Sequence, residues 1–92
     1  MKFEFIGWNS VDGHDKVWAA IQLSEDKVVT VWGRRGKKLS TRIVENDYSL
    51  HRLIMSKLKK GYSPILSESL DKVYPEFKTD LEKTAFWATF KV

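Results

Sequence analysis

The sequence predicts an α+β fold: an antiparallel β-meander of about four strands, one helix packed on the sheet, and a mostly helical C-terminal extension. Between residues 2 and 45, four runs alternate β-branched or aromatic residues with polar ones, as strands do. Short connections separate these runs, and such connections join antiparallel neighbours. Beyond residue 46 the apolar spacing changes to three and four, which is the helical period.

The expected strands cover residues 2–8, 16–23, 28–34 and 39–45, with turns at 9–15, 24–27 and 35–37. Phe3 and Phe5 alternate with polar neighbours in the first strand. The second strand has two faces, one with Val17, Ala19, Ile21 and Leu23 and the other with Trp18, Ala20 and Gln22.

The expected helix is capped by Asn46 or Asp47 and ended by Gly61. Its apolar residues are Leu50, Leu53, Ile54 and Leu58, so this helix can close the apolar face of the sheet. At 100° per residue Lys57 falls within the apolar sector, and its ammonium group must reach outward past a buried stem. Arg52 and Lys59 fall on the outer face.

The last thirty residues are expected to contain a short helix at 67–74 and a second helix at 75–83, which Pro75 begins. Residues 84–92 also have a strand-like composition, and their structure stays open. We expect a domain at 1–63 and an extension at 64–92 that packs on it. The phenylalanines and three tryptophans are expected in the core: Trp8, Trp18 and Trp87.

Composition narrows the possible functions of this chain of 92 residues, which is long enough for one small domain. With no cysteine, disulfide frameworks, zinc–thiolate sites and thiol nucleophiles are excluded. No apolar run approaches a membrane span, so we expect a soluble, cytoplasmic monomer without membrane partners. The sequence contains no residue spacing typical of a catalytic site and no phosphate-binding glycine loop, so we expect that the protein is not an enzyme and has no cofactor. The segment Asp12-Gly13-His14-Asp15 is interpreted as a turn, so we expect no metal site.

Positive charge is concentrated in the first two-thirds of the chain. The formal net charge is +4, with +5 in residues 1–62 and −1 in residues 63–92. Such asymmetry favours an anionic partner, although a charge of this size is also ordinary for solubility.

The most informative segment is Trp32-Gly33-Arg34, which opens a stretch of five cations without a carboxylate: Arg34, Arg35, Lys37, Lys38 and Arg42. If the strand runs through Gly33, Trp32 and Arg34 project from the same face. An indole can stack on a base, and a guanidinium can hold a phosphate with two hydrogen bonds. The alternatives to such an anion-binding surface are that Trp32 lies in the core and that the cations belong to a solvated hairpin tip. Further candidate phosphate contacts are Lys16, Lys57, Lys59 and Lys60.

The segment Val31-Trp32-Gly33-Arg34-Arg35-Gly36 resembles the signature of the WGR domain family. Three more pieces match in the family's order: Lys16-Val17-Trp18 with Gln22-Leu23, the helix from Leu50, and Lys57-Leu58-Lys59-Lys60-Gly61-Tyr62. The resemblance covers about residues 2–63 and implies an antiparallel sheet with a packed helix. It also implies that Trp32 stacks at a DNA end, as in break-sensing poly(ADP-ribose) polymerases, and that Arg34 contacts DNA or a neighbouring domain.

Two functional hypotheses follow. The first is a non-enzymatic nucleic-acid-binding module, with DNA ends or nicks favoured as the ligand, which could associate with the nucleoid. The alternative is a protein-interaction or regulatory module, because residues 63–92 are acidic and rich in aromatic side chains.

Overall fold

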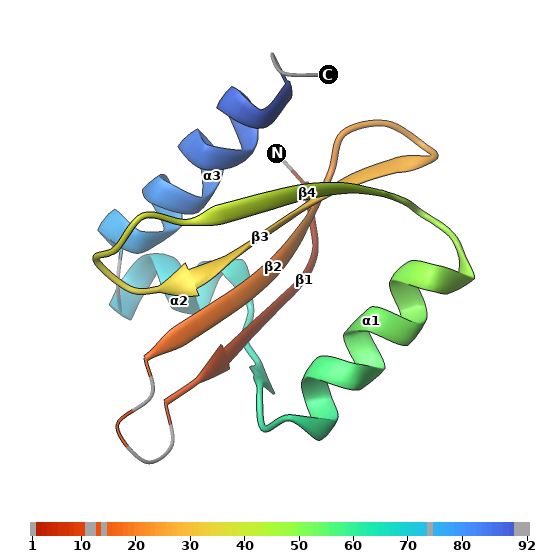
Figure 1. Ribbon diagram of the computed structural model, residues 1–92. Helices are drawn as coiled ribbons and strands as arrows, with labels where there is room; N and C mark the ends of the chain where they lie inside the picture. Colours follow the sequence, from red (N-terminus) through yellow and green to blue (C-terminus); the bar gives the residue numbers. More distant parts are fainter. Residues whose placement is uncertain (1, 11–12, 14, 74, 90–92) are drawn as a thin grey trace.

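The computed structural model describes residues 2–10, 13, 15–73 and 75–89, in which one antiparallel sheet carries helices on both faces (Figure 1). The elements in chain order are β1 (Lys2–Asn9), β2 (Lys16–Gln22), β3 (Lys27–Arg34), β4 (Ser40–Glu45), α1 (Tyr48–Lys59), β5 (Ser63–Pro64), α2 (Ser67–Val73) and α3 (Pro75–Thr89). Strand order is β4-β3-β2-β1-β5, which confirms the α+β class and the four-strand meander. The two-residue strand β5 was not predicted.

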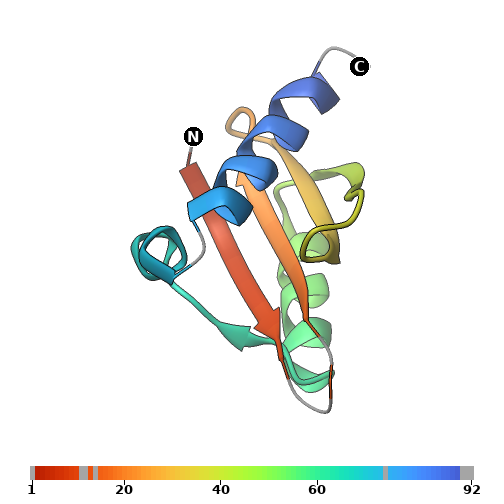
Figure 2. The ribbon, with the colours of Figure 1, turned by 90° about the vertical axis from the view of Figure 1, so that its left-hand side faces the viewer.

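Both faces of the sheet are covered, and Figure 2 shows α3 on one side and α1 on the other. One apolar cluster joins the sheet to α2 and α3, and it includes Val17, Ala19 and Ile21. The second cluster lies on the α1 side and includes Trp18 and Ala20. The predicted division of β2 into two faces is therefore confirmed, and each face has its own helical cover.

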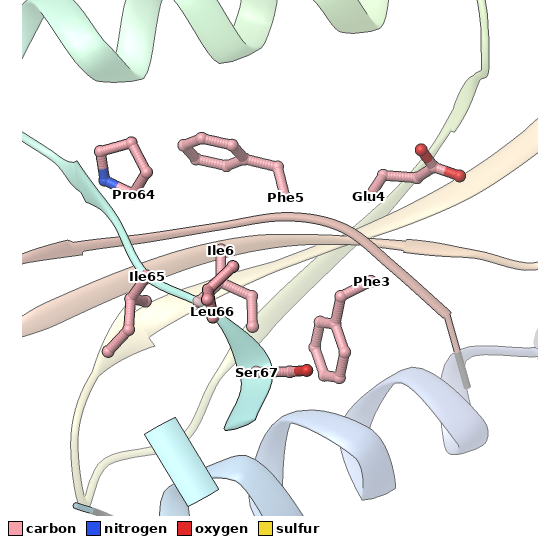
Figure 3. Close-up of a pocket in the computed structure, with 8 residues that line it drawn as sticks. All are labelled: Phe3, Glu4, Phe5, Ile6, Pro64, Ile65, Leu66 and Ser67. Carbon is pink, nitrogen blue, oxygen red and sulfur yellow. The ribbon is translucent and has the colours of Figure 1, made fainter. Parts of the chain in front are cut away.

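A β-bulge in β1 changes the expected positions of its two phenylalanines. The pairing with β2 shifts between Phe3 and Phe5, so the intervening Glu4 has no partner in that register. An extra residue inverts the alternation beyond it. Phe5 consequently packs on the α1 side and Phe3 on the α3 side, where strict alternation would place both on one face (Figure 3).

The limits of α1 follow from local chemistry, as predicted. The Asp47 carboxylate accepts a hydrogen bond of 2.8 Å from the Ser49 N–H, which caps the helix. At the other end Gly61 has a φ of +97°, a left-handed conformation that glycine adopts without a steric penalty. Leu50 is buried on the side of the helix that faces the sheet, whereas Arg52 and Lys59 are exposed on its outer face.

Helix α3 continues to Thr89, beyond the predicted end at residue 83. Its buried residues, at spacings of four, four and three, are Phe77, Leu81, Ala85 and Ala88. This helical stripe packs on β3 and β4 and extends through the segment whose composition resembled a strand. Among the described residues, no helix combines the length and apolar character needed to cross a membrane.

The expectation that the phenylalanines and three of the tryptophans are core residues was wrong for two residues of α3, and Phe90 lies outside the described residues. Trp87 is 64 % exposed and Phe86 is 50 % exposed, because both lie outside the buried stripe of the helix. Trp18 is buried as expected. Trp8 is half-buried, and its indole N–H donates a hydrogen bond of 3.0 Å to Asp15 Oδ1.

We expect α3 to be an integral part of the core. Leu81→Ala should lower the free energy of unfolding by about 2–5 kcal/mol, because Leu81 is completely buried against the sheet. Leu66→Ala is the matched control and should change it by less than about 0.5 kcal/mol, since Leu66 is largely exposed. Urea unfolding measures both variants. Equal, small losses would show that the sheet does not depend on α3.

Candidate nucleic-acid interface

The register between β2 and β3 brings two tryptophans and two cations together. Trp18 is the cross-strand partner of Trp32, and Lys16 is the partner of Arg34. Because alternate residues of a strand share a face, all four side chains project on the α1 side of the sheet. Arg42 of β4 projects from the same side, diagonal to Trp32. We call Lys16, Trp32, Arg34, Arg42 and Lys57 the basic face.

Trp32 is half-buried on this face. It packs against the cluster that contains Trp18 and Leu50, and the rest of its surface stays accessible. Strand β3 runs through Gly33 as far as Arg34, so Trp32 and Arg34 do share a face. The ring is therefore anchored on the core and is also available for stacking. This combines features of the two alternatives that the sequence left open, a core residue and an exposed stacking residue.

Gly33 has a steric reason to be glycine. Its φ is +153°, and an added Cβ would lie 2.9 Å from Leu39 Cδ2, which packs on the opposite side of the sheet. A side chain at this position would push the β3–β4 hairpin away from Leu39. Gly33 thus maintains the backbone geometry between Trp32 and Arg34.

Lys57 lies at the seam between α1 and the sheet, as its place in the helical wheel predicted. Its Nζ is 5.8 Å from the centroid of the Trp18 ring, which is within the range of a cation–π interaction. Burial lowers the pKa of Lys57, and the nearby charge of Lys60 lowers it further. The ammonium group is consequently less hydrated than that of an exposed lysine.

Lys16 and Arg34 are like charges at directly opposite positions of an antiparallel pair. Such pairs are destabilising, because their Cβ atoms are only about 4.5–5.5 Å apart. Within the part of the chain that the structure describes, no carboxylate forms an ion pair with either residue. Folding alone therefore gives no reason for the two charges to be adjacent, whereas an anionic ligand would.

Arg35 does not share this environment, because a carboxylate from another loop pairs with it. Arg35 Nε donates a hydrogen bond of 2.8 Å to Asp15 Oδ2, and the Arg35 backbone N–H donates to the Asp15 carbonyl at 2.9 Å. The five cations have no carboxylate between them along the chain, but in the folded protein a carboxylate from a distant segment pairs with one of them. Asp15 fixes the start of the β3–β4 turn to the loop before β2.

The remaining predicted residues lie elsewhere. Lys37 and Lys38 line a hollow against α3, on the far side of the hairpin from Trp32. Lys59 and Lys60 line a shallow hollow on α1 together with Tyr48 and Arg52. The eleven predicted site residues therefore do not form one surface, and only part of them belongs to the basic face.

Sequence reasoning missed Trp18 and Asp15 as parts of this region. Trp18 is the aromatic neighbour of both Trp32 and Lys57. Asp15 neutralises a cation twenty positions further along the chain. A signal for Trp18 existed, since it lies two residues from Lys16 on the same strand face; no local pattern linked Asp15 to Arg35.

A third hollow lies at the β1 edge and has a volume of about 500 Å³. Figure 3 shows Phe5 and Pro64 on one side of β1 and Ile65 and Leu66 on the other. Among the described residues of its lining Glu4 is the only ionisable one, so this part of the chain does not give the hollow the convergent polar groups of a typical ligand site. No group of three or more potential metal ligands occurs among the described residues. Asp12 and His14 lie outside those residues.

Comparisons of the chain with protein-family models, curated proteins and solved structures found no match.

The lowered pKa of Lys57 predicts a pH-dependent contribution to stability. Between that lowered pKa and the ordinary value of 10.5, the unfolded chain keeps a proton on Lys57 that the folded chain has released. The unfolding free energy of the wild type should therefore rise with pH relative to that of Lys57→Met. Urea unfolding of both proteins, from neutral pH to about 10.5, measures the difference.

Comparing the wild type with Lys57→Met removes the contributions of other groups that titrate in this pH range. Lys27 and Tyr62 have raised pKa values and would make both proteins less stable at high pH, but both proteins contain them. Parallel pH profiles for the wild type and Lys57→Met would contradict the burial of the Lys57 ammonium group.

Proposed function

We propose that the protein is a non-enzymatic nucleic-acid-binding module that contacts DNA, at ends or nicks, through the basic face. Phosphates would be bound by the cations, and Trp32 would offer a stacking surface for a terminal base or sugar. The proposal places the protein in the cytoplasm, in contact with the nucleoid. It agrees with what the resemblance of residues 2–63 to the WGR family implies for Trp32 and Arg34.

The observation that carries the proposal is the adjacent pair of Lys16 and Arg34 beside a half-accessible tryptophan. A polyanion would relieve the repulsion between these two charges, and release of its counterions would supply affinity. Binding of this type is weakly dependent on sequence, because phosphates carry no base identity. The proposed contacts come from strand ends and from the seam between α1 and the sheet.

The second candidate function is a protein-interaction module. It is favoured by the exposed aromatic residues Phe86 and Trp87 on α3, outside the region of the WGR resemblance. A partner bound there would not need Arg34 or the accessible part of Trp32, so the two functions predict different sensitivities to substitution.

Arg34→Ala should weaken binding to a short blunt DNA duplex and make it less dependent on salt. If Lys16, Arg34, Arg42 and Lys57 each neutralise one phosphate, log affinity should fall against log salt with a slope of about −3.6. Removing Arg34 should make that slope shallower by about 0.9. Fluorescence anisotropy over a range of salt concentrations measures both values.

Lys72→Ala is the matched control, because Lys72 is an exposed cation of α2, on the opposite side of the sheet. It should leave the slope unchanged, although it changes the net charge by the same amount. Equal effects of the two substitutions would show that DNA is attracted by the net charge of the protein and not bound specifically by the basic face. A salt-independent affinity in the wild type would remove the proposal.

A further inference from the structure

A hollow of about 430 Å³ lies between the β3–β4 hairpin and α3. Gly36, Lys37, Lys38 and Leu39 contribute to it from the hairpin, and Asp80, Lys83, Thr84, Trp87 and Ala88 contribute from α3. It is on the α3 side of the sheet, whereas the basic face is on the α1 side. The hairpin therefore separates two cationic surfaces, each with an accessible tryptophan.

Trp87 is the aromatic surface of this hollow. It is 64 % exposed, and its position in α3 lies outside the buried stripe that holds the helix on the sheet. The Phe86 ring meets it edge-on, with centroids 6.0 Å apart and an interplanar angle of 73°. Because most of the indole surface is exposed, a planar ligand could stack on it.

The charge of the hollow is positive. The described part of its lining has three lysines and one carboxylate, Asp80, as ionisable groups. Within the described residues, Lys37, Lys38 and Lys83 form no ion pair, while the ion pair found in α3 joins Lys78 to Glu82. The Thr84 hydroxyl donates to the Asp80 carbonyl at 2.7 Å, so its proton is already used within the helix. Three cations and one carboxylate of the lining thus stand outside the ion pairs of the described residues, and the hollow has a net charge of +2.

We propose that this hollow binds an unpaired segment of nucleic acid, with a base stacked on Trp87 and phosphates at Lys37, Lys38 and Lys83. Aromatic side chains with surrounding cations are the combination that binds single strands without sequence preference. This inference rests on the proposed function and sharpens it. The preferred ligand becomes a duplex end with a single-stranded overhang, the duplex on the basic face and the overhang in the hollow.

The test compares a blunt duplex with the same duplex carrying a short 3′ or 5′ overhang of mixed sequence. For the wild type, the overhang of suitable polarity should raise affinity about 5- to 150-fold, the gain expected for one stacked base. Trp87→Ala should abolish this gain and leave the affinity for the blunt duplex unchanged. Phe86→Ala is the matched control, since Phe86 is an exposed neighbour outside the lining of the hollow, and it should retain most of the gain.

A double substitution, Lys37→Ala with Lys38→Ala, tests the same site without touching the helix. It should make the salt slope for the overhang duplex shallower by about 1.4, because each phosphate of a single strand contributes about 0.7, and leave the blunt slope unchanged. Thermal unfolding of each variant shows whether the fold is intact.

The two proposals fail in different ways. If the blunt duplex binds and is sensitive to Arg34→Ala, but neither overhang adds affinity, the hollow is not a nucleic-acid site and the proposed function stands. An overhang gain that survives Trp87→Ala has the same consequence. If the wild type binds none of the duplexes, both proposals fall. Binding of an acidic peptide that Trp87→Ala abolishes, with no gain from an overhang, would assign the hollow to a protein ligand.

Discussion

The pairing register of β2 and β3 is the constraint on which the rest of the molecule depends. Both faces of these central strands are buried, so Val17 and Ala19 must face α3 while Trp18 and Ala20 face α1. A slip of one residue would exchange the two sets and destroy both clusters. The packing of the core therefore fixes what lies at the end of the strands, where Lys16 meets Arg34.

The elements could be predicted from the sequence because their signals are local. Alternation predicted the strands, and a capping aspartate with a terminal glycine predicted α1. The partners of each strand position are not local, so the contact of Trp18 with Trp32 and the ion pair of Asp15 with Arg35 could not be derived from spacing. In the last turns of α3, the continued stripe of Ala85 and Ala88 decided the conformation, against an aromatic composition typical of a strand.

The dense run of cations in the sequence is dispersed in the folded protein. Arg34 still belongs to a strand and follows its alternation onto the α1 side. Arg35 pairs with Asp15, and beyond the turn Lys37 and Lys38 border α3. A hairpin thus converts neighbours along the chain into residues of different surfaces. Residues distant in sequence complete each surface, as Lys57 does on one side and Lys83 on the other.

The ion pair of Asp15 with Arg35 has a further consequence for any ligand that meets both surfaces. It ties the hairpin to the loop before β2 through one side-chain and one backbone hydrogen bond, at the boundary between the basic face and the hollow of α3. The backbone of the hairpin between the two surfaces is thereby constrained before a ligand arrives. A pre-organised surface loses less conformational entropy on binding, so each contact contributes more to affinity. If both proposals hold, the pairing of one central cation would favour recognition by the others, because a polyanion that passes around the hairpin would meet a constrained edge with cations and an indole on each side.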